Sequence, residues 1–215
     1  MIISILCSDA NHPVVESLRA WVVDVSSKGH VATLVFDKSE LCGGDILYLV
    51  SCSQIVSDVE RNKYKSALLL HASDLPKGRG WSPYIWSILG GENHVTVSLL
   101  EACDPVDSGA IWLKTTFDLE GHELLPEINA KLFEAELLLM SQALDQFDCI
   151  TPTPQLGESG PYMKRRTPED SRLDPSKTIA EQFNLLRVVD SIRYPAFFEY
   201  HGQQYLIRIE KVKNE

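Results

Sequence analysis

One stretch of the chain, residues 68–83, constrains the fold more than any other, because a buried-looking strand leads directly into a histidine and a turn-rich loop. Three consecutive leucines at 68–70 are typical of a strand that is covered on both faces in a parallel sheet. His71 follows them, and the loop beyond it contains Pro76, Gly78, Gly80 and Pro83. Ligands in open α/β sheets bind beyond the carboxyl ends of the strands. The sequence therefore predicts that His71 lies at the mouth of a ligand site, with a hydrogen-bonded core histidine as the alternative.

The periodicity of apolar residues predicts the other elements. Strands are expected at 2–6, 31–36, 45–50, 95–100 and 111–117, and helices at 13–29, 54–62, 83–89 and 123–147. The order strand, helix, strand, strand at the start is that of a doubly wound domain. We therefore expect an α/β fold with a doubly wound, mostly parallel, Rossmann-like sheet.

The composition changes after residue 150. Proline, glycine, serine and charged residues dominate 151–177, which predicts a long loop of the kind that is functional or disordered. A helix over 175–189 and a hairpin across His201 and Gly202, ending near Val212, are expected to follow. We therefore divide the chain into a catalytic core at 1–150 and a loop, helix and hairpin extension at 151–215, which packs on the core and completes the acceptor site.

Charge and cysteine content restrict the class of partner. The net charge of −10 argues against nucleic acid, because an acidic surface opposes the approach of phosphates. No apolar run is long enough for a membrane span, and residues 1–7 are too short and lack the basic residues of a signal peptide. Five scattered cysteines without a Cys-x-x-Cys pair indicate reduced thiols rather than a disulfide framework or a zinc site. We expect a cytoplasmic protein without a metal or a membrane partner.

Several polar motifs have two readings when each is taken alone. Ser51 and Ser53 follow a predicted strand and either cap a helix or contact a ligand. Residues 104–109, which include Asp107, read as a hairpin turn. Arg79 either pairs with a surface carboxylate or binds an anionic ligand. The basic run 164–166 either binds a diphosphate or belongs to a solvated loop.

The order and spacing of these residues resemble those of the 10-formyltetrahydrofolate-dependent formyltransferases. The pattern is His71-x-Ser73-x-Leu75-Pro76-x-x-Arg79-Gly80, followed by Pro83, Trp86, Gly90-Gly91 and Asp107-Ser108-Gly109. The resemblance implies that His71 and Asp107 are catalytic. It also implies that 10-formyltetrahydrofolate is the formyl donor, released as tetrahydrofolate, and that no metal takes part. The implied donor-binding residues are Ser73, Leu75, Pro76, Gly78, Arg79 and Gly80.

The second half of the chain is similar to N-formyltransferases of nucleotide-linked amino sugars, and most to the short type associated with pseudaminic acid pathways. The similar residues are 164–170, Asn184, Arg187 and 194–198. The implied acceptor is the amine of a nucleotide-linked deoxy amino sugar, for example a UDP-4-amino-trideoxy-altrose type precursor of pseudaminic acid. The implied acceptor-binding residues are Ser51, Ser53, Tyr162, Lys164, Arg165, Arg166, Asn184, Arg187 and Phe197. Alternatives are formylation of another amine (glycinamide ribonucleotide, aminoacyl-tRNA or a carrier-bound amino acid) and a non-catalytic folate- or nucleotide-binding relative.

The chemistry of the two central residues fits formyl transfer to an amine. The reaction needs a neutral nitrogen nucleophile, stabilisation of the oxyanion and removal of a proton from the amine. A histidine titrates near neutrality, so His71 can act as base or proton shuttle. A neighbouring carboxylate raises the basicity of an imidazole and fixes its orientation, which is the role expected for Asp107.

One position departs from the family pattern. These enzymes usually carry asparagine two residues before the histidine, where its amide donates to the formyl oxygen, and this chain has Leu69 there. The loop backbone, Ser73 and Asn93 are weak candidates for a replacement donor; otherwise the oxyanion faces water or the protein is a poor catalyst. Relatives often pair through their C-terminal segments, so a homodimer through the apolar residues Phe197 and Phe198 is a further expectation, with closure of the core by the same residues as the alternative.

Overall fold

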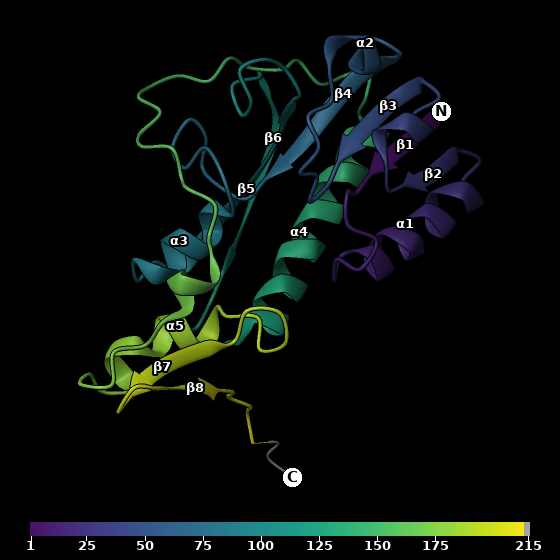
Figure 1. Ribbon diagram of the computed structural model, residues 1–215. Coiled ribbons are helices and arrows are strands. Elements are labelled where there is room, and N and C mark those ends of the chain that lie inside the picture. The colour runs from purple at the N-terminus through teal and green to yellow at the C-terminus, as the bar shows by residue number, and fades with distance from the viewer. Residues whose placement is uncertain (213–215) are drawn as a thin grey trace.

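A computed structural model describes residues 1–212 and shows one central sheet of six strands with helices packed against it (Figure 1). The strand order is β2-β1-β3-β4-β5-β6. Strand β5 runs antiparallel to β4 and β6, and the pairs β1–β2, β1–β3 and β3–β4 are parallel, which confirms the mostly parallel α/β sheet. The strands are β1 (Ile2–Leu6), β2 (Val31–Val35), β3 (Gly44–Leu49), β4 (Tyr64–His71), β5 (His94–Glu101) and β6 (Ile111–Asp118).

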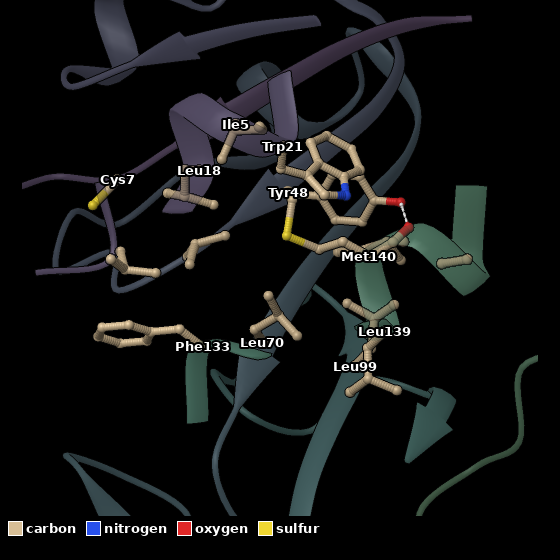
Figure 2. Close-up of a cluster of buried hydrophobic side chains, with 14 of the residues drawn as sticks. Ile5, Cys7, Leu18, Trp21, Tyr48, Leu70, Leu99, Phe133, Leu139 and Met140 are labelled. Atoms are coloured by element: carbon tan, nitrogen blue, oxygen red, sulfur yellow. Dashed lines mark hydrogen bonds between the residues drawn. The ribbon is translucent and has the colours of Figure 1, made fainter. Parts of the chain in front are cut away.

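The two longest helices, α1 (Val15–Ser27) and α4 (Leu125–Asp145), pack side by side on one face of the sheet (Figure 1). Apolar residues recur along each helix every three or four positions, so each helix presents one apolar face to the strands. Figure 2 shows the core that forms between them, with Trp21 of α1 edge-on to Tyr48 of β3. The Tyr48 hydroxyl donates to the carbonyl of Met140 at 2.9 Å, so the buried phenol of Tyr48 has a partner.

The opposite face of the sheet is covered by connecting segments and short elements. These include η1 (Lys38–Glu40) and α2 (Asp58–Arg61). The short helix α3 (Pro83–Leu89) instead packs beside the start of α4, where Ile85 and Ile88 contact Val95 and Ile128. A smaller apolar cluster on this part of the sheet includes Leu47, Val56 and Tyr64, and the Tyr64 hydroxyl donates to the Ser4 hydroxyl at 2.9 Å. Both faces of β1 and β3 are therefore buried, as parallel strands require.

The extension from residue 151 contains η2 (Pro168–Ser171), η3 (Ala180–Gln182), α5 (Phe183–Arg187) and the hairpin of β7 (Ala196–Tyr200) and β8 (Gln203–Ile207). It begins at the end of α4, where Thr153 pairs with Ile111, and then runs past the loop after β4 until α5, β7 and β8 lie near the start of α4 (Figure 1). The hairpin turns at His201 and Gly202 as expected, but β8 ends at Ile207 and not near Val212. Lys211 instead binds the Glu127 carboxylate at 2.6 Å, which draws the chain towards the start of α4.

Two expected helices are much shorter than the sequence pattern suggested. The helix expected at 175–189 is replaced by a turn, η3 and the five-residue α5. The Asp174 carboxylate accepts from the amide and hydroxyl of Ser176, and Gln182 bonds both the amide and the carbonyl of Asp174. Such side-chain bonds to the backbone stabilise a turn in competition with a helix. The helix expected at 54–62 shrinks in the same way to α2, whose start is fixed by Ser57 and Glu60.

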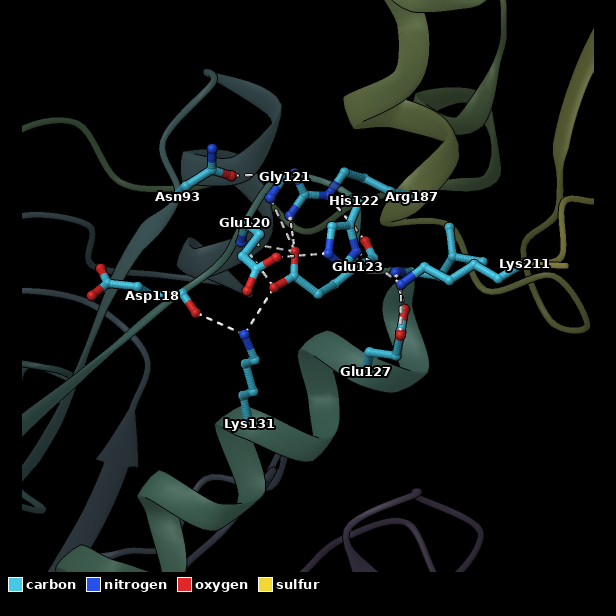
Figure 3. Close-up of polar contacts among 11 residues, drawn as sticks. Asn93, Asp118, Glu120, Gly121, His122, Glu123, Glu127, Lys131, Arg187 and Lys211 are labelled. Atoms are coloured by element: carbon cyan, nitrogen blue, oxygen red, sulfur yellow. Dashed lines mark hydrogen bonds and ion pairs between the residues drawn. The ribbon is translucent and has the colours of Figure 1, made fainter. Parts of the chain in front are cut away.

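A buried ion pair attaches the extension to the core (Figure 3). Arg187 is 1% exposed, and its guanidinium donates to the Glu123 carbonyl at 3.1 Å and to the Asn93 side-chain oxygen at 3.2 Å. It also lies 3.6 Å from the Glu123 carboxylate. The extension is therefore held to β5 and α4 by one guanidinium.

The Glu123 carboxylate is well satisfied in this position (Figure 3). Burial opposes its ionisation, but hydrogen bonds from Lys131 and from the amides of Glu120 and Gly121 outweigh that effect and lower the pKa of Glu123 to about 2. The carboxylate therefore remains ionised throughout the neutral range, and it balances the charge of Arg187.

Replacing Arg187 with alanine should lower the free energy of unfolding by about 3 kcal/mol, because it removes a buried guanidinium and leaves the Glu123 carbonyl and the Asn93 side-chain oxygen without their donor. Chemical denaturation measures this change. The matched control is Arg172→Ala, which breaks two ion pairs of an exposed arginine and should cost at most about 1 kcal/mol. Equal costs for the two variants would contradict the structural role of Arg187.

Candidate functional site

A cavity of about 570 Å³ opens at the carboxyl ends of β1, β3 and β4. This is the edge at which ligands bind in open α/β sheets, and the volume lies in the range of small-molecule sites. Its wall combines the segments after β1 and β3, the end of β4, the start of α3, the turn before β6, one face of α4 and part of the extension. The cavity therefore collects residues from distant parts of the chain.

His71 and Asp107 face each other in this cavity. His71 is the last residue of β4 and is 7% exposed, while Asp107 is 5% exposed. The distance from His71 Nδ1 to Asp107 Oδ1 is 3.6 Å, and His71 Nε2 lies 2.9 Å from the carbonyl oxygen of Gly78. The imidazole is thus oriented from both sides, which holds it against the cavity.

Asp107 is fixed by its backbone as well as by its side chain. It adopts a left-handed conformation with φ of 63°, which few residues other than glycine accept without cost. The Gly80 amide donates to Asp107 Oδ2 at 2.9 Å, and the Gln155 side-chain nitrogen donates to the Asp107 carbonyl at 2.9 Å. Ser51 and Ser82 are also left-handed and also line the cavity. Unusual backbone of this kind is concentrated at functional sites.

The loop after His71 is joined to the extension by a short backbone bridge. The Met163 amide donates to the Arg79 carbonyl at 2.7 Å, and the Trp81 amide donates to the Met163 carbonyl at 3.0 Å. The bridge brings Tyr162 and Arg165 to the rim of the cavity. Arg165 lies over the Trp81 ring at 4.8 Å, in a cation–π contact.

The residues expected to bind the donor are only partly gathered at the cavity. Gly80 lines it, whereas Ser73, Leu75, Pro76, Gly78 and Arg79 form the remainder of the loop and are not among its lining residues. Leu75 is buried with Leu100, and Arg79 donates to the Gln155 side chain at 3.2 Å. These residues shape the loop that carries Gly80 and the Gly78 carbonyl.

The residues expected to bind the acceptor divide into two groups. Ser51, Ser53, Tyr162 and Arg165 line the cavity. Lys164, Arg166, Asn184, Arg187 and Phe197 are not among its lining residues.

Four residues of the second group, Lys164, Arg166, Arg187 and Phe197, have structural partners outside the cavity, and the acceptor role of the group stays a prediction. Lys164 pairs with Asp170 at 2.7 Å, and Arg166 donates to the Asp170 carbonyl at 3.1 Å. Burial lowers the pKa of Arg166. Phe197 is a buried residue of β7, and Arg187 belongs to the Glu123 ion pair.

Several lining residues were not singled out from the sequence, among them His12, Trp81, Tyr84 and Glu136. Glu136 is the clearest case, since it is 5% exposed on α4. Burial raises its pKa to about 8. A single carboxylate inside the apolar stripe of a predicted helix is the sequence signal that would have identified it.

The position two residues before His71 is apolar in the structure too. Leu69 lines the cavity, so no side-chain donor stands there. Of the expected replacements, Asn93 uses its side-chain oxygen to accept from Arg187, and neither Asn93 nor Ser73 is a lining residue. Both weak candidates are therefore placed away from the site, and the loop backbone stays as the remaining one.

No family model matches the sequence, but its fold is that of known formyltransferases. The methionyl-tRNA formyltransferase from Clostridium thermocellum superposes with a TM-score of 0.83 at 22% identity, covering 99% of this chain and 94% of that one. A sugar N-formyltransferase from Shewanella gives a TM-score of 0.70 at 18% identity, covering 99% of both chains.

HypX from Aquifex aeolicus in complex with tetrahydrofolic acid gives a TM-score of 0.81 at 20% identity, covering 99% of this chain and 39% of that one. The structural neighbours therefore include both sugar-acting and other formyltransferases. Within residues 1–212, no helix combines the length and apolarity needed to cross a bilayer, and no three metal-ligating side chains are grouped.

Replacing Gly80 with alanine should destabilise the protein by several kcal/mol, because a Cβ there would overlap the Met163 backbone in addition to straining a φ of +108°. Gly91→Ala is the matched control, since Gly91 has a φ of +94° but nothing within 4 Å of the added Cβ. It should cost about 1 kcal/mol. Thermal unfolding of the two variants compares the costs, and similar melting temperatures would argue against the bridge between the loop and the extension.

Proposed function

We propose that the protein transfers a formyl group from 10-formyltetrahydrofolate to the amine of a nucleotide-linked deoxy amino sugar. The pairing of His71 with Asp107 at 3.6 Å, inside a cavity at the ligand-binding edge of the sheet, is the observation that carries the proposal. The fold shared with sugar N-formyltransferases supports it. A pseudaminic acid precursor of the UDP-4-amino-trideoxy-altrose type is the specific acceptor that we propose.

The donor fits the residues that surround the cavity. The Gly80 backbone and the left-handed Ser51 and Ser82 leave main chain rather than bulky side chains beside the site, which suits a flat ring system. The walls at Leu49, Leu69 and Val56 are apolar. When bound, 10-formyltetrahydrofolate supplies an activated formyl group for attack by an amine.

In this proposal His71 removes the proton that the amine loses after attack and delivers it to the departing nitrogen. Asp107 acts through His71, because it orients the ring and stabilises its cationic form. The Nε2–H of His71 donates to the Gly78 carbonyl at 2.9 Å, so Nδ1, which lies 3.6 Å from Asp107, is the nitrogen that accepts the proton in this proposal. No metal takes part in these steps.

The rim of the cavity suits the nucleotide of the acceptor. Tyr162 is 61% exposed and lies near Trp81, so an aromatic surface is available for stacking on a base. Arg165 can bind a diphosphate while its side chain remains over the Trp81 ring. We assign acceptor recognition to these residues together with Ser51 and Ser53.

We also propose a cytoplasmic location and a homodimer. All five cysteines are free, which fits a reducing compartment. Tyr200, Tyr205 and Leu206 are exposed on the β7–β8 hairpin and offer an apolar surface for a second copy.

A second candidate function follows from Leu69. Because this leucine replaces the usual amide donor, a non-catalytic folate- or nucleotide-binding protein would explain the apolar wall. Turnover of 10-formyltetrahydrofolate with a panel of nucleotide amino sugars, followed by absorbance of the folate product, separates the two. Sugar-dependent turnover supports the enzyme, and binding without turnover of any amine supports the second candidate.

Replacing His71 with alanine should lower kcat/KM by a factor on the order of 10² to 10⁴, because the reaction loses its proton acceptor. The matched control is His94→Ala, since His94 also pairs with an aspartate, Asp118, but does so on the surface. Its activity should stay within twofold. Retention of full activity in the His71 variant would refute the proposed mechanism.

Replacing Leu69 with asparagine should raise kcat, because it places an amide donor two residues before the histidine. A well-aligned donor to a developing oxyanion is worth roughly 10²-fold or more, and we expect at least about a tenfold gain in an unoptimised position. The gain should appear in kcat rather than in the KM for the acceptor. A Leu69→Asn variant that is folded and slower than wild type would show that another group already occupies this role.

A further inference from the structure

Glu136 is a buried carboxylate that the fold does not explain. It is 5% exposed, and its Oε2 atom is enclosed without a hydrogen-bond partner among the described residues. The other buried residues of α4 are apolar, namely Ile128, Leu132, Phe133, Ala135, Leu139, Met140, Ala143 and Leu144. An unsatisfied carboxyl group in such surroundings is costly, and an apolar residue of similar size would avoid that cost.

The side chain belongs to the wall of the cavity. Leu132, Phe133 and Glu136 lie on one face of α4 and all three line the cavity that contains His71 and Asp107. The Glu136 carboxyl group is therefore part of the cavity wall, where a ligand can supply a donor to it.

The neighbouring protein groups cannot supply this donor. The titratable groups that face Glu136 are Cys7 after β1 and Tyr84 on α3, and burial raises the pKa of both, so neither is charged. The Cys7 thiol donates to the Asp9 carbonyl at 3.6 Å. The Tyr84 hydroxyl donates to the Asn129 side chain at 3.2 Å. His12 lines the same cavity, and burial followed by the charge of Arg193 lowers its pKa. No cation of the protein therefore balances the carboxylate on this wall in the described structure.

Formyl transfer to an ammonium ion releases one proton in addition to the proton that passes to the leaving group, and Glu136 offers a place for it. An acceptor amine arrives as an ammonium ion with three N–H bonds, and the formamide product keeps one. One proton passes to the departing nitrogen of the donor, and one must leave the site. Removal of the first proton has to precede attack, because an ammonium nitrogen has no free electron pair. His71 accounts for the proton that passes to the leaving group.

We propose that Glu136 binds the ammonium form of the acceptor and takes its first proton. In this step an N–H bond of the ammonium breaks, an O–H bond forms on the Glu136 carboxylate, and the nitrogen keeps its electron pair for attack on the formyl carbon. The proton then passes to solvent. The assignment deepens the proposed function and rests on it, and it defines the substrate as a primary amine rather than a hydroxyl compound.

Burial supports this role. It raises the pKa of Glu136 to about 8, close to the range in which a carboxyl group can exchange a proton with an amine near neutral pH. A bound ammonium ion would favour the ionised form of Glu136, so binding of the ligand would convert the carboxyl group into the base.

The test is the variant Glu136→Gln, which keeps the shape of the side chain but cannot accept the proton. We expect the KM for the amine acceptor to rise at least about tenfold and kcat to fall on the order of 10²-fold near neutral pH. The KM for the formyl donor should stay within twofold. The deficit in kcat/KM should shrink as the pH rises towards values at which the acceptor amine is neutral in solution.

The matched control is Glu134→Gln, because Glu134 lies on the same helix but is exposed. Its kinetics should equal those of wild type. The glutamine variant at 136 should unfold at no lower temperature than wild type, since it removes a group whose ionised form is destabilised by burial. An unchanged acceptor KM in a folded Glu136→Gln protein, or a deficit that is constant with pH, would overturn the proposal.

A binding measurement separates this inference from the proposed function. Calorimetry compares a UDP-linked 4-amino-deoxy sugar with the same sugar nucleotide carrying a hydroxyl at that position. A preference for the amine of tenfold or more in wild type, lost in Glu136→Gln, supports Glu136 as the amine-binding group even if no formyl transfer is observed. An equal preference in both proteins refutes it even if the wild type is an active formyltransferase.

Discussion

The hydrogen bond from the Gly80 amide to the Asp107 carboxylate organises the site, because it joins the loop after β4 to the turn before β6. His71 is held by the rigid end of β4, but the turn that carries Asp107 is not part of the sheet. The bond at Gly80 and the contact of Gln155 with the Asp107 carbonyl fix that turn. The same loop carries the Gly78 carbonyl that orients the imidazole. The catalytic pair therefore depends on backbone groups as much as on its own two side chains.

The extension contributes to the cavity because it is attached at two separate places. The bridge at Met163 holds its first part against the loop, and the Arg187–Glu123 ion pair holds its last part against α4. Charged side chains perform the second attachment from inside the protein, where exposed ion pairs would contribute little. Of the three basic residues that looked suitable for a diphosphate, Lys164 and Arg166 bond groups within the extension, and Arg165 remains at the rim of the cavity.

Strand periodicity is a local signal, and it was sufficient to predict the sheet. The meeting of His71 with Asp107 was implied by the resemblance to formyltransferases instead, because residues 104–109 taken alone read as a hairpin turn. The sequence was misleading for 175–189, where Asp174 and Gln182 bond the backbone and end the helix that apolar spacing favoured. The sequence also could not predict that Arg187 is buried in an ion pair, since a buried guanidinium and a ligand-binding guanidinium have the same local sequence. The sequence also could not show that Glu136 lines the cavity. That depends on which side of α4 faces the site, and packing against distant strands determines it.

The apolar residue at position 69 and the carboxylate at position 136 can be understood together. An amide donor at 69 would stabilise the oxyanion directly, whereas leucine excludes water from the same wall. Exclusion of water lowers the local dielectric constant and strengthens the interaction of a bound ammonium ion with Glu136 and of His71 with Asp107. Exclusion of water from this wall also keeps the pKa of Glu136 raised, so the carboxyl group stays protonated until a cation binds beside it. In such a site the same carboxylate, Glu136, selects a charged amine and removes its proton. Stabilisation of the oxyanion is then left to His71 and the loop backbone.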